Sequence, residues 1–197
     1  SNHKYLNKTI EEIGADISTM DIDSLRGFSS NIKGIYHELL FAKDENSDFD
    51  GISAELFSKT NHPGADVEFK ISGLKIGEAQ LKATDSVSAI KEHQEKYPDT
   101  DIYATKEVAE KITGVNSSGF SNISLTEDVE GVIEDLTKSE VVESLTTVPI
   151  ASGLMSAVLQ SKDVLTGKTK VSLAGKEILK DAGIAVSASL LIDVLFS

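Results

Sequence analysis

The chain contains no cysteine among its 197 residues, so it can form neither a disulfide framework nor a thiolate metal site. Basic residues are scarce, because 19 Lys and Arg face 32 Asp and Glu, and the formal net charge is −13. No Lys/Arg-rich arm and no basic helix with interleaved aromatic residues occurs, which argues against tight binding of long nucleic acid duplexes. With 40% apolar and 26% charged residues, the chain can still bury a globular core.

Several common catalytic and ligand-binding motifs are also missing. The segment from Gly114 to Gly119 lacks the Lys-Ser/Thr ending of a Walker phosphate-binding loop. The four histidines do not have the spacing of zinc ligands, and no Gly-x-Ser-x-Gly elbow occurs. No apolar run reaches the roughly 20 residues that span a bilayer, and no basic, apolar leader opens the chain. We therefore expect a cytoplasmic protein by default, with an effector secreted without a classical signal as the alternative.

Apolar periodicity and turn residues predict an alternating order of helices and strands. An amphipathic helix is expected over residues 6–17, and a second helix is expected to run from a Ser24 cap to Leu39. The further expected elements are strands at 52–59, 65–71, 74–83 and 101–105, helices at 87–96 (capped by Ser86) and 106–112, a loop at 114–122, and a helix from a Thr126 cap to Leu136. This order predicts an α/β domain with a mixed sheet flanked by helices.

The composition changes near Thr147, after which Ala, Gly, Ser, Val and Leu dominate. We therefore expect three parts: an N-terminal helix at 1–23, an α/β domain at 24–144 and an Ala/Gly-rich, all-helical tail at 145–197. Small residues at helical spacing suit close helix contacts. The tail is thus expected to pack on the α/β domain or on a second copy, giving a homo-oligomer. Contact of the tail with a membrane is the alternative.

The densest group of chemically useful side chains lies on a predicted hairpin. Asp66 opens one strand, a Ser72-Gly73 turn follows, and Gln80 and Lys82 lie on the next strand. Because side chains alternate along a strand, Gln80 and Lys82 share a face with Glu78. We expect a carboxylate, an amide oxygen and an ammonium side by side at the edge of the sheet. Oxygen ligands for a hard cation, together with a lysine near the attacking water, suit metal-dependent phosphodiester cleavage.

This pattern resembles the PD-(D/E)xK nuclease superfamily, the restriction-endonuclease-like nucleases, in its Gln-x-Lys variant, over roughly residues 25–105. The resemblance implies a restriction-endonuclease-like mixed sheet and a site that binds Mg²⁺ or Mn²⁺. It also implies that Asp66, Gln80 and Glu38 hold the metal. Lys82 would then orient or deprotonate the attacking water, and the backbone carbonyl of Leu81 is a further candidate ligand.

Other polar residues near these positions have two interpretations each. Glu68 and Glu78 are expected to be further ligands or partners around the site, or else to decorate a solvent-facing side of the sheet. Glu38 is either an active-site acid or an ordinary exposed helix residue. His37 is expected to be a partly exposed structural histidine. His93 either reaches the mouth of the site or belongs to a solvent-facing charged run.

Two functions therefore remain open. The first is a metal-dependent nuclease that hydrolyses DNA or RNA, as a toxin or mobile-element module whose acidic charge suits a basic immunity partner. The second is a catalytically inactive nuclease-fold module for binding or assembly, with an oligomerising or membrane-associating tail. The acidic net charge and the Gln80 amide in place of an acid favour the second function. Convergence of Glu38, Asp66, Gln80 and Lys82 in one pocket would favour the first.

Overall fold

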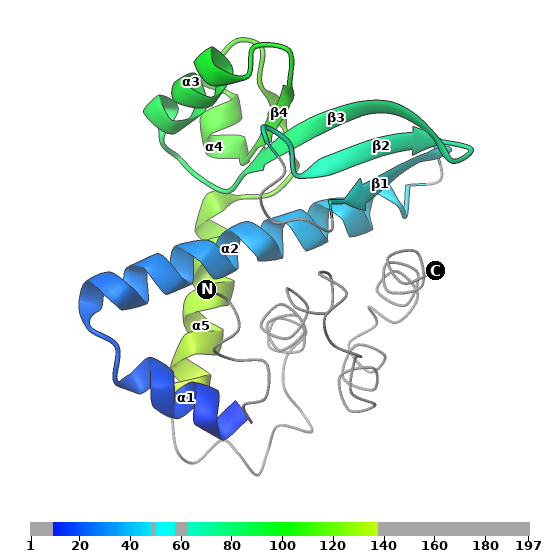
Figure 1. Cartoon of the computed structure of the whole chain (residues 1–197). Coiled ribbons are helices and arrows are strands. Elements are labelled where there is room, and N and C mark those ends of the chain that lie inside the picture. Colours follow the sequence, from blue (N-terminus) through cyan, green and yellow to red (C-terminus); the bar gives the residue numbers. More distant parts are fainter. Residues whose placement is uncertain (1–9, 49, 58–62, 138–197) are drawn as a thin grey trace. The chain divides into compact units, whose positions relative to one another are not determined.

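The computed structural model describes residues 10–48, 50–57 and 63–137 (Figure 1). The elements are α1 (Ile10–Ser18), α2 (Ile22–Glu45), β1 (Ile52–Leu56), β2 (Val67–Ile71), β3 (Leu74–Lys82), α3 (Val87–Lys96), β4 (Asp101–Ala104), α4 (Lys106–Ala109), β5 (Asn116–Ser117) and α5 (Asn122–Thr137). The strands form one sheet in the order β1-β2-β3-β4-β5. The first three strands pair antiparallel, and β3, β4 and β5 pair parallel. This mixed sheet with flanking helices confirms the expected α/β class.

The described residues belong to two compact units. Gly34–Leu125 contains the sheet, the second half of α2, and helices α3 and α4. The other unit contains α1, the first half of α2 and most of α5. The expected helical tail at 145–197 lies outside the described residues. No helix in the ranges described is long and apolar enough to cross a membrane.

In the unit that contains α1, a glycine marks a close approach of two helices. An added Cβ at Gly14 would overlap the backbone carbonyl oxygen of Leu136 in α5. Any larger residue at this position would therefore push α1 away from α5.

Helix α2 begins at Ile22, ahead of the expected Ser24 cap, which was therefore wrong. Asp21 caps the helix instead, because its carboxylate accepts hydrogen bonds from the Ser24 backbone N–H at 2.8 Å and from the Ser24 hydroxyl at 2.9 Å. The bond from the Ser24 backbone favours the ionised carboxylate, and together with the hydroxyl bond it lowers the pKa of Asp21.

An aromatic cluster packs α2 against one face of the sheet. The Phe41 ring lies 6.1 Å from the Phe69 ring of β2 and 5.0 Å from the Tyr103 ring of β4, between centroids. The Phe69 and Tyr103 rings are themselves 5.7 Å apart. Edge-to-face and tilted aromatic contacts of this kind stabilise by about 0.5–1.5 kcal/mol each beyond the burial of area.

Helices α3 and α4 pack against the other face of the same sheet. The apolar cluster there consists of Ile90, Ile102, Ala104 and Val108. In the parallel register, Gln80 is the neighbour of Ile102 and Lys82 is the neighbour of Ala104. Neighbouring residues in a sheet share a face, so Gln80 and Lys82 lie on the α3 side, opposite the aromatic cluster.

Two sequence-based expectations about the sheet were wrong. β3 is the third of the five strands, so the hairpin residues do not lie at the edge of the sheet. The reason is that β4 pairs along β3 from Ala79 to Lys82 and covers that side. The expected loop at 114–122 contains β5, which pairs with Tyr103 and Ala104. A strand of two exposed residues has no apolar alternation that a sequence could show.

The cap of α5 also differs from the expectation, since the helix begins at Asn122 rather than after Thr126. The Glu107 carboxylate accepts hydrogen bonds from the backbone N–H groups of Asn122 at 2.8 Å and Ile123 at 3.4 Å, and from the Ser121 hydroxyl. Burial alone would raise the pKa of Glu107, but these hydrogen bonds outweigh it and lower the pKa to about 2. The cap was missed because its carboxylate comes from α4.

Candidate functional site

The site is built on the β2–β3 hairpin. Ser72 and Gly73 both have positive φ, 51° and 78°, which is the backbone of a tight two-residue hairpin turn. The turn pairs Ile71 with Leu74, and a β-bulge between Phe69 and Lys70 then shifts the register by one residue, so that Val67 faces Ala79. Asp66, just before β2, donates its backbone N–H to the Ala79 carbonyl at 2.9 Å. The Asp66 side chain therefore lies at the open end of the hairpin.

Three polar groups meet at this end of the hairpin. Asp66 Oδ2 accepts hydrogen bonds from the Leu81 backbone N–H at 2.9 Å and from Gln80 Nε2. The same Gln80 nitrogen donates to the Leu81 carbonyl oxygen at 3.1 Å. A carboxylate oxygen and a carbonyl oxygen thus face one point, where the Gln80 amide group lies. Rotation of that amide by 180° would add its own oxygen to the other two.

This donor set fits a hard divalent cation. Mg²⁺ and Mn²⁺ prefer carboxylate, carbonyl and water oxygens, and Mg²⁺ keeps several waters when it binds proteins. Asp66 can supply a carboxylate oxygen, Gln80 an amide oxygen and Leu81 a backbone carbonyl oxygen. Across the described parts of the chain, no group of three or more His, Cys, Asp or Glu side chains is arranged to hold a metal ion. A site here would therefore depend on the Gln80 amide and on backbone oxygen.

Lys82 lies beyond Gln80 on the same face of β3, and a histidine from α3 lies near it. Burial lowers the pKa of His93, and the positive charge of Lys82 lowers it further. His93 is 9% exposed, and its Nε2 donates to the Gly64 carbonyl oxygen at 3.1 Å. The interpretation of His93 as part of a solvent-facing run was therefore wrong.

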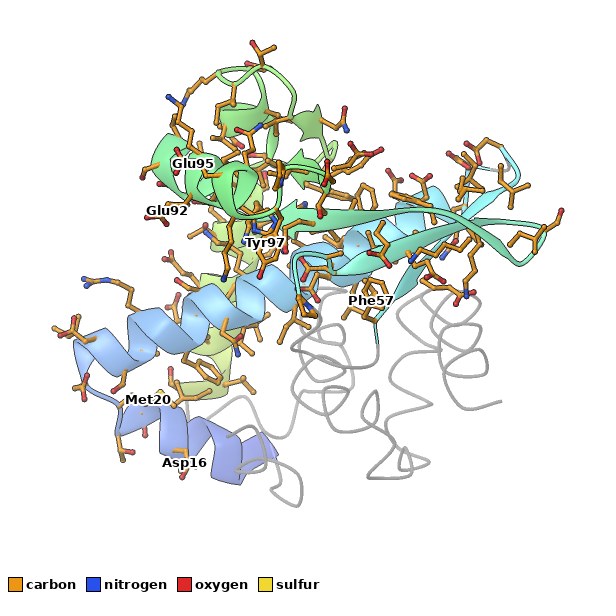
Figure 2. The ribbon with its side chains drawn as sticks, turned by 45° about the horizontal axis from the view of Figure 1, so that its top comes forward. Asp16, Met20, Phe57, Glu92, Glu95 and Tyr97 are labelled. Atoms are coloured by element: carbon orange, nitrogen blue, oxygen red, sulfur yellow. The ribbon has the colours of Figure 1, made fainter. Side chains whose placement is uncertain are left out.

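Tyr97 completes the contact between α3 and the start of the hairpin. The His93 and Tyr97 rings are 4.9 Å apart, and a Cβ added to Gly64 would lie 2.7 Å from Tyr97 Cδ1. Gly64 has φ +83°, a left-handed conformation that favours glycine. Figure 2 shows Tyr97 turned inward toward the sheet, whereas Glu92 and Glu95 point outward from α3. We call His93 and Tyr97 the α3 clamp, because they hold the backbone that leads into Asp66.

Glu38 lies on α2 and is half-buried. One turn further along α2, Phe41 packs against the sheet face opposite Gln80 and Lys82. Glu38 therefore belongs to a helix that covers the face of the sheet opposite Gln80 and Lys82. Its place among the metal ligands stays a prediction.

Glu68 and Glu78 take part in an ion-pair ladder across the hairpin. Lys70 pairs with Glu55 and, at 3.3 Å, with Glu68. Lys75 pairs with Glu78 and, at 3.3 Å, with Glu68. These ion pairs stabilise the pairing of the strands. A role for Glu68 or Glu78 beside a metal stays a prediction.

His37 is a structural residue, but the expectation that it is partly exposed was wrong. Its side chain is 0% exposed, and Nε2 lies 2.7 Å from the Ser118 hydroxyl oxygen. The imidazole also meets the Phe120 ring edge-on at 5.8 Å. His37 thus joins α2 to the loop that follows β5.

The sequence did contain one signal for the α3 clamp. Val87, Ile90, His93 and Tyr97 recur at helical spacing, so His93 occupies a position on the apolar side of α3. The charged neighbours Lys91 and Glu92 obscured this pattern.

Comparison of the chain with protein-family models, curated proteins and solved structures finds no match. The function proposed below therefore rests on the residues and geometry of the site.

Proposed function

We propose that this protein is a metal-dependent nuclease with a restriction-endonuclease-like fold of the PD-(D/E)xK type. It would hydrolyse phosphodiester bonds of DNA or RNA, with Mg²⁺ or Mn²⁺ as the cofactor. One observation carries the proposal: the Asp66 carboxylate and the Leu81 carbonyl converge on the Gln80 amide, on the strand that also bears Lys82. A role as a toxin or mobile-element module, with a basic immunity partner, belongs to the same proposal.

The side chains would divide the work as follows. Asp66, Gln80 and the Leu81 carbonyl would hold the cation, and Glu38 would complete the set through water. A bound divalent cation stabilises negative charge on the phosphate during attack by water. Lys82 would donate a hydrogen bond to the attacking water or to a phosphate oxygen and fix its position. The α3 clamp would keep the Asp66 carboxylate in place beneath these groups.

The test is cleavage of plasmid DNA, single-stranded DNA and total RNA with Mg²⁺ or Mn²⁺. Asp66→Asn and Lys82→Gln are compared with the wild type. Lys91→Gln, an exposed lysine on α3, is the matched control for the loss of one positive charge. We expect both site variants to lose at least about a hundredfold in rate and the control to keep its activity. Absence of cleavage by the wild type, with no metal binding by calorimetry, would overturn the proposal.

A second candidate function is supported by one contact. The Gln80 amide donates a hydrogen bond directly to the Asp66 carboxylate, so this carboxylate has a partner within the protein itself. A nuclease-fold module that binds a partner or assembles without catalysis would keep such a contact. The expected tail at 145–197 would then drive oligomers or membrane contact. Calorimetry separates the two functions, because the module would not bind Mg²⁺ or Mn²⁺ at Asp66.

A further inference from the structure

Two lysines near the α3 clamp differ from the lysines of the hairpin. Lys70 and Lys75 each form ion pairs with two glutamates. Within the residues that the structure describes, Lys82 and Lys96 have no carboxylate at ion-pair distance. In a chain of net charge −13, these two ammonium groups are available to attract an anion.

Lys96 lies over one of the rings of the α3 clamp, and Lys82 lies on the face of β3 that α3 covers. Lys96 Nζ is 5.1 Å from the centroid of the Tyr97 ring, and that ring packs beside His93. After burial, the positive charges of Lys82 and then of Lys96 lower the pKa of His93. The positive charges of the two lysines, one on β3 and one at the end of α3, therefore act on the same imidazole.

Gathering like charges costs free energy, and an anion placed between them offsets that cost. The contact with the Tyr97 ring limits the freedom of Lys96 before any ligand arrives, which lowers the entropy lost on binding. The same place lies beside Gly64, two residues before Asp66. An anion held by these lysines would therefore lie next to the Asp66–Gln80 group.

We propose that Lys96 and Lys82 form a phosphate-binding subsite that holds the backbone of a single-stranded nucleic acid against the Asp66–Gln80 group. The inference rests on the proposed function, since the phosphate belongs to the substrate of that site. Two cations can neutralise about two phosphates, whereas tight binding of a duplex needs more cations, and the sequence contains no Lys/Arg-rich arm. Lys96 is the residue that tests the subsite, because Lys82 already serves the proposed reaction.

The test measures binding of a fluorescent single-stranded DNA oligonucleotide of about 12 nucleotides by anisotropy, in EDTA and at low salt, so that no cleavage occurs. We expect Lys96→Gln to weaken binding about five- to tenfold and to reduce the slope of log K against log[salt] by about 0.7. Lys96→Arg should restore binding, and Lys91→Gln on the exposed side of α3 should bind like the wild type.

Two further ligands identify the group that is bound. An oligonucleotide with uncharged methylphosphonate linkages should lose most of the binding, and inorganic phosphate should compete. Equal affinities for wild type and Lys96→Gln, or no difference between Lys96→Gln and Lys91→Gln, would overturn the subsite. The same holds if the wild type does not bind the oligonucleotide.

The outcome is separable from that of the nuclease test. Binding that depends on Lys96, in a protein that cleaves nothing with metal, would overturn the nuclease and leave the subsite. Metal-dependent cleavage with binding indifferent to Lys96→Gln would overturn the subsite and leave the nuclease.

Discussion

His93 Nε2 donates a hydrogen bond to the Gly64 carbonyl oxygen at 3.1 Å, and this contact ties α3 to the backbone just before Asp66. The hairpin alone brings Asp66 and Gln80 together, but it does not fix the chain that enters it. Tyr97 fixes that chain from the side, because its ring occupies the space that a Cβ of Gly64 would fill. The candidate site thus depends on a helix that contributes none of the proposed metal ligands.

Replacement of Gly64 should reveal the α3 clamp. Gly64→Ala combines a positive φ of 83° with a collision against Tyr97, so we expect a loss of about 2–3 kcal/mol in the free energy of unfolding. Gly73→Ala is the matched control, since Gly73 has φ +78° and no atom within 4 Å of an added Cβ. That variant should lose only about 1 kcal/mol. Urea unfolding of both variants measures the difference, and equal losses would contradict the collision.

His93 should make stability depend on pH near neutrality. Burial, and next the charge of Lys82, holds the pKa of His93 below its ordinary value of 6.5. Below pH 6.5 the unfolded chain binds the proton more readily than the folded protein, so stability is complete above this pH and falls as the pH drops. His93→Gln keeps an N–H donor for Gly64 but removes the titration. Unfolding at pH 7.5 and pH 5.5 should show a smaller loss in the variant, and an unchanged loss would exclude His93 as its source.

Gln80→Glu should lower the stability of the metal-free protein and raise its affinity for a divalent cation. The change replaces the amide that donates to Asp66 by a second carboxylate, which repels the first in the absence of a cation. We expect a lower Tm without metal and about tenfold tighter binding of Mn²⁺, measured by thermal unfolding and calorimetry. Asp66→Asn in the same background should abolish the gain. A Tm that is insensitive to metal in Gln80→Glu would exclude a cation at this position.

Glu107→Gln should weaken the start of α5. Loss of the capping carboxylate is expected to cost about 1–2 kcal/mol at neutral pH. The pKa of Glu107 is depressed to about 2 from 4.5, so its contribution is complete above pH 4.5 and is lost as the pH falls toward 2. Unfolding at several pH values should therefore show a difference from wild type that shrinks below pH 4.5. Glu110→Gln, an exposed residue after α4, is the control, and a difference that persists at low pH would contradict the cap.

The elements that the sequence predicted well are those determined by local chemistry. The Ser72-Gly73 turn favours a hairpin wherever it occurs between two strands, and the hairpin follows. Ser86 caps α3 as expected, because its hydroxyl accepts the Ala89 N–H at 3.3 Å. The expected common face of Glu78, Gln80 and Lys82 is also confirmed, because these half-buried residues alternate with buried residues along β3.

The elements that the sequence did not predict depend on residues far apart in the chain. β5 exists because Asn116 and Ser117 lie beside β4, and neither residue has strand propensity of its own. The start of α5 depends on Glu107, and no residue next to α5 in the sequence indicates this cap. The burial of His93 depends on Gly64, whose carbonyl becomes its partner only after the chain crosses from β3 to β4. Tertiary contacts of this kind leave little trace in a local pattern.

The topology of β3 also sets an order of folding. Asp66 and Gln80 lie across a hairpin with a two-residue turn, and hairpins form in about 1–10 μs from contacts near in sequence. β4 joins β3 in parallel only after the α3 crossover has formed, which is a slower, non-local step. Asp66 and Gln80 therefore meet early, while His93 and Lys96 reach them late. During synthesis, Asp66, Gln80 and Lys82 would therefore be in place on the nascent chain before Lys96 joins them.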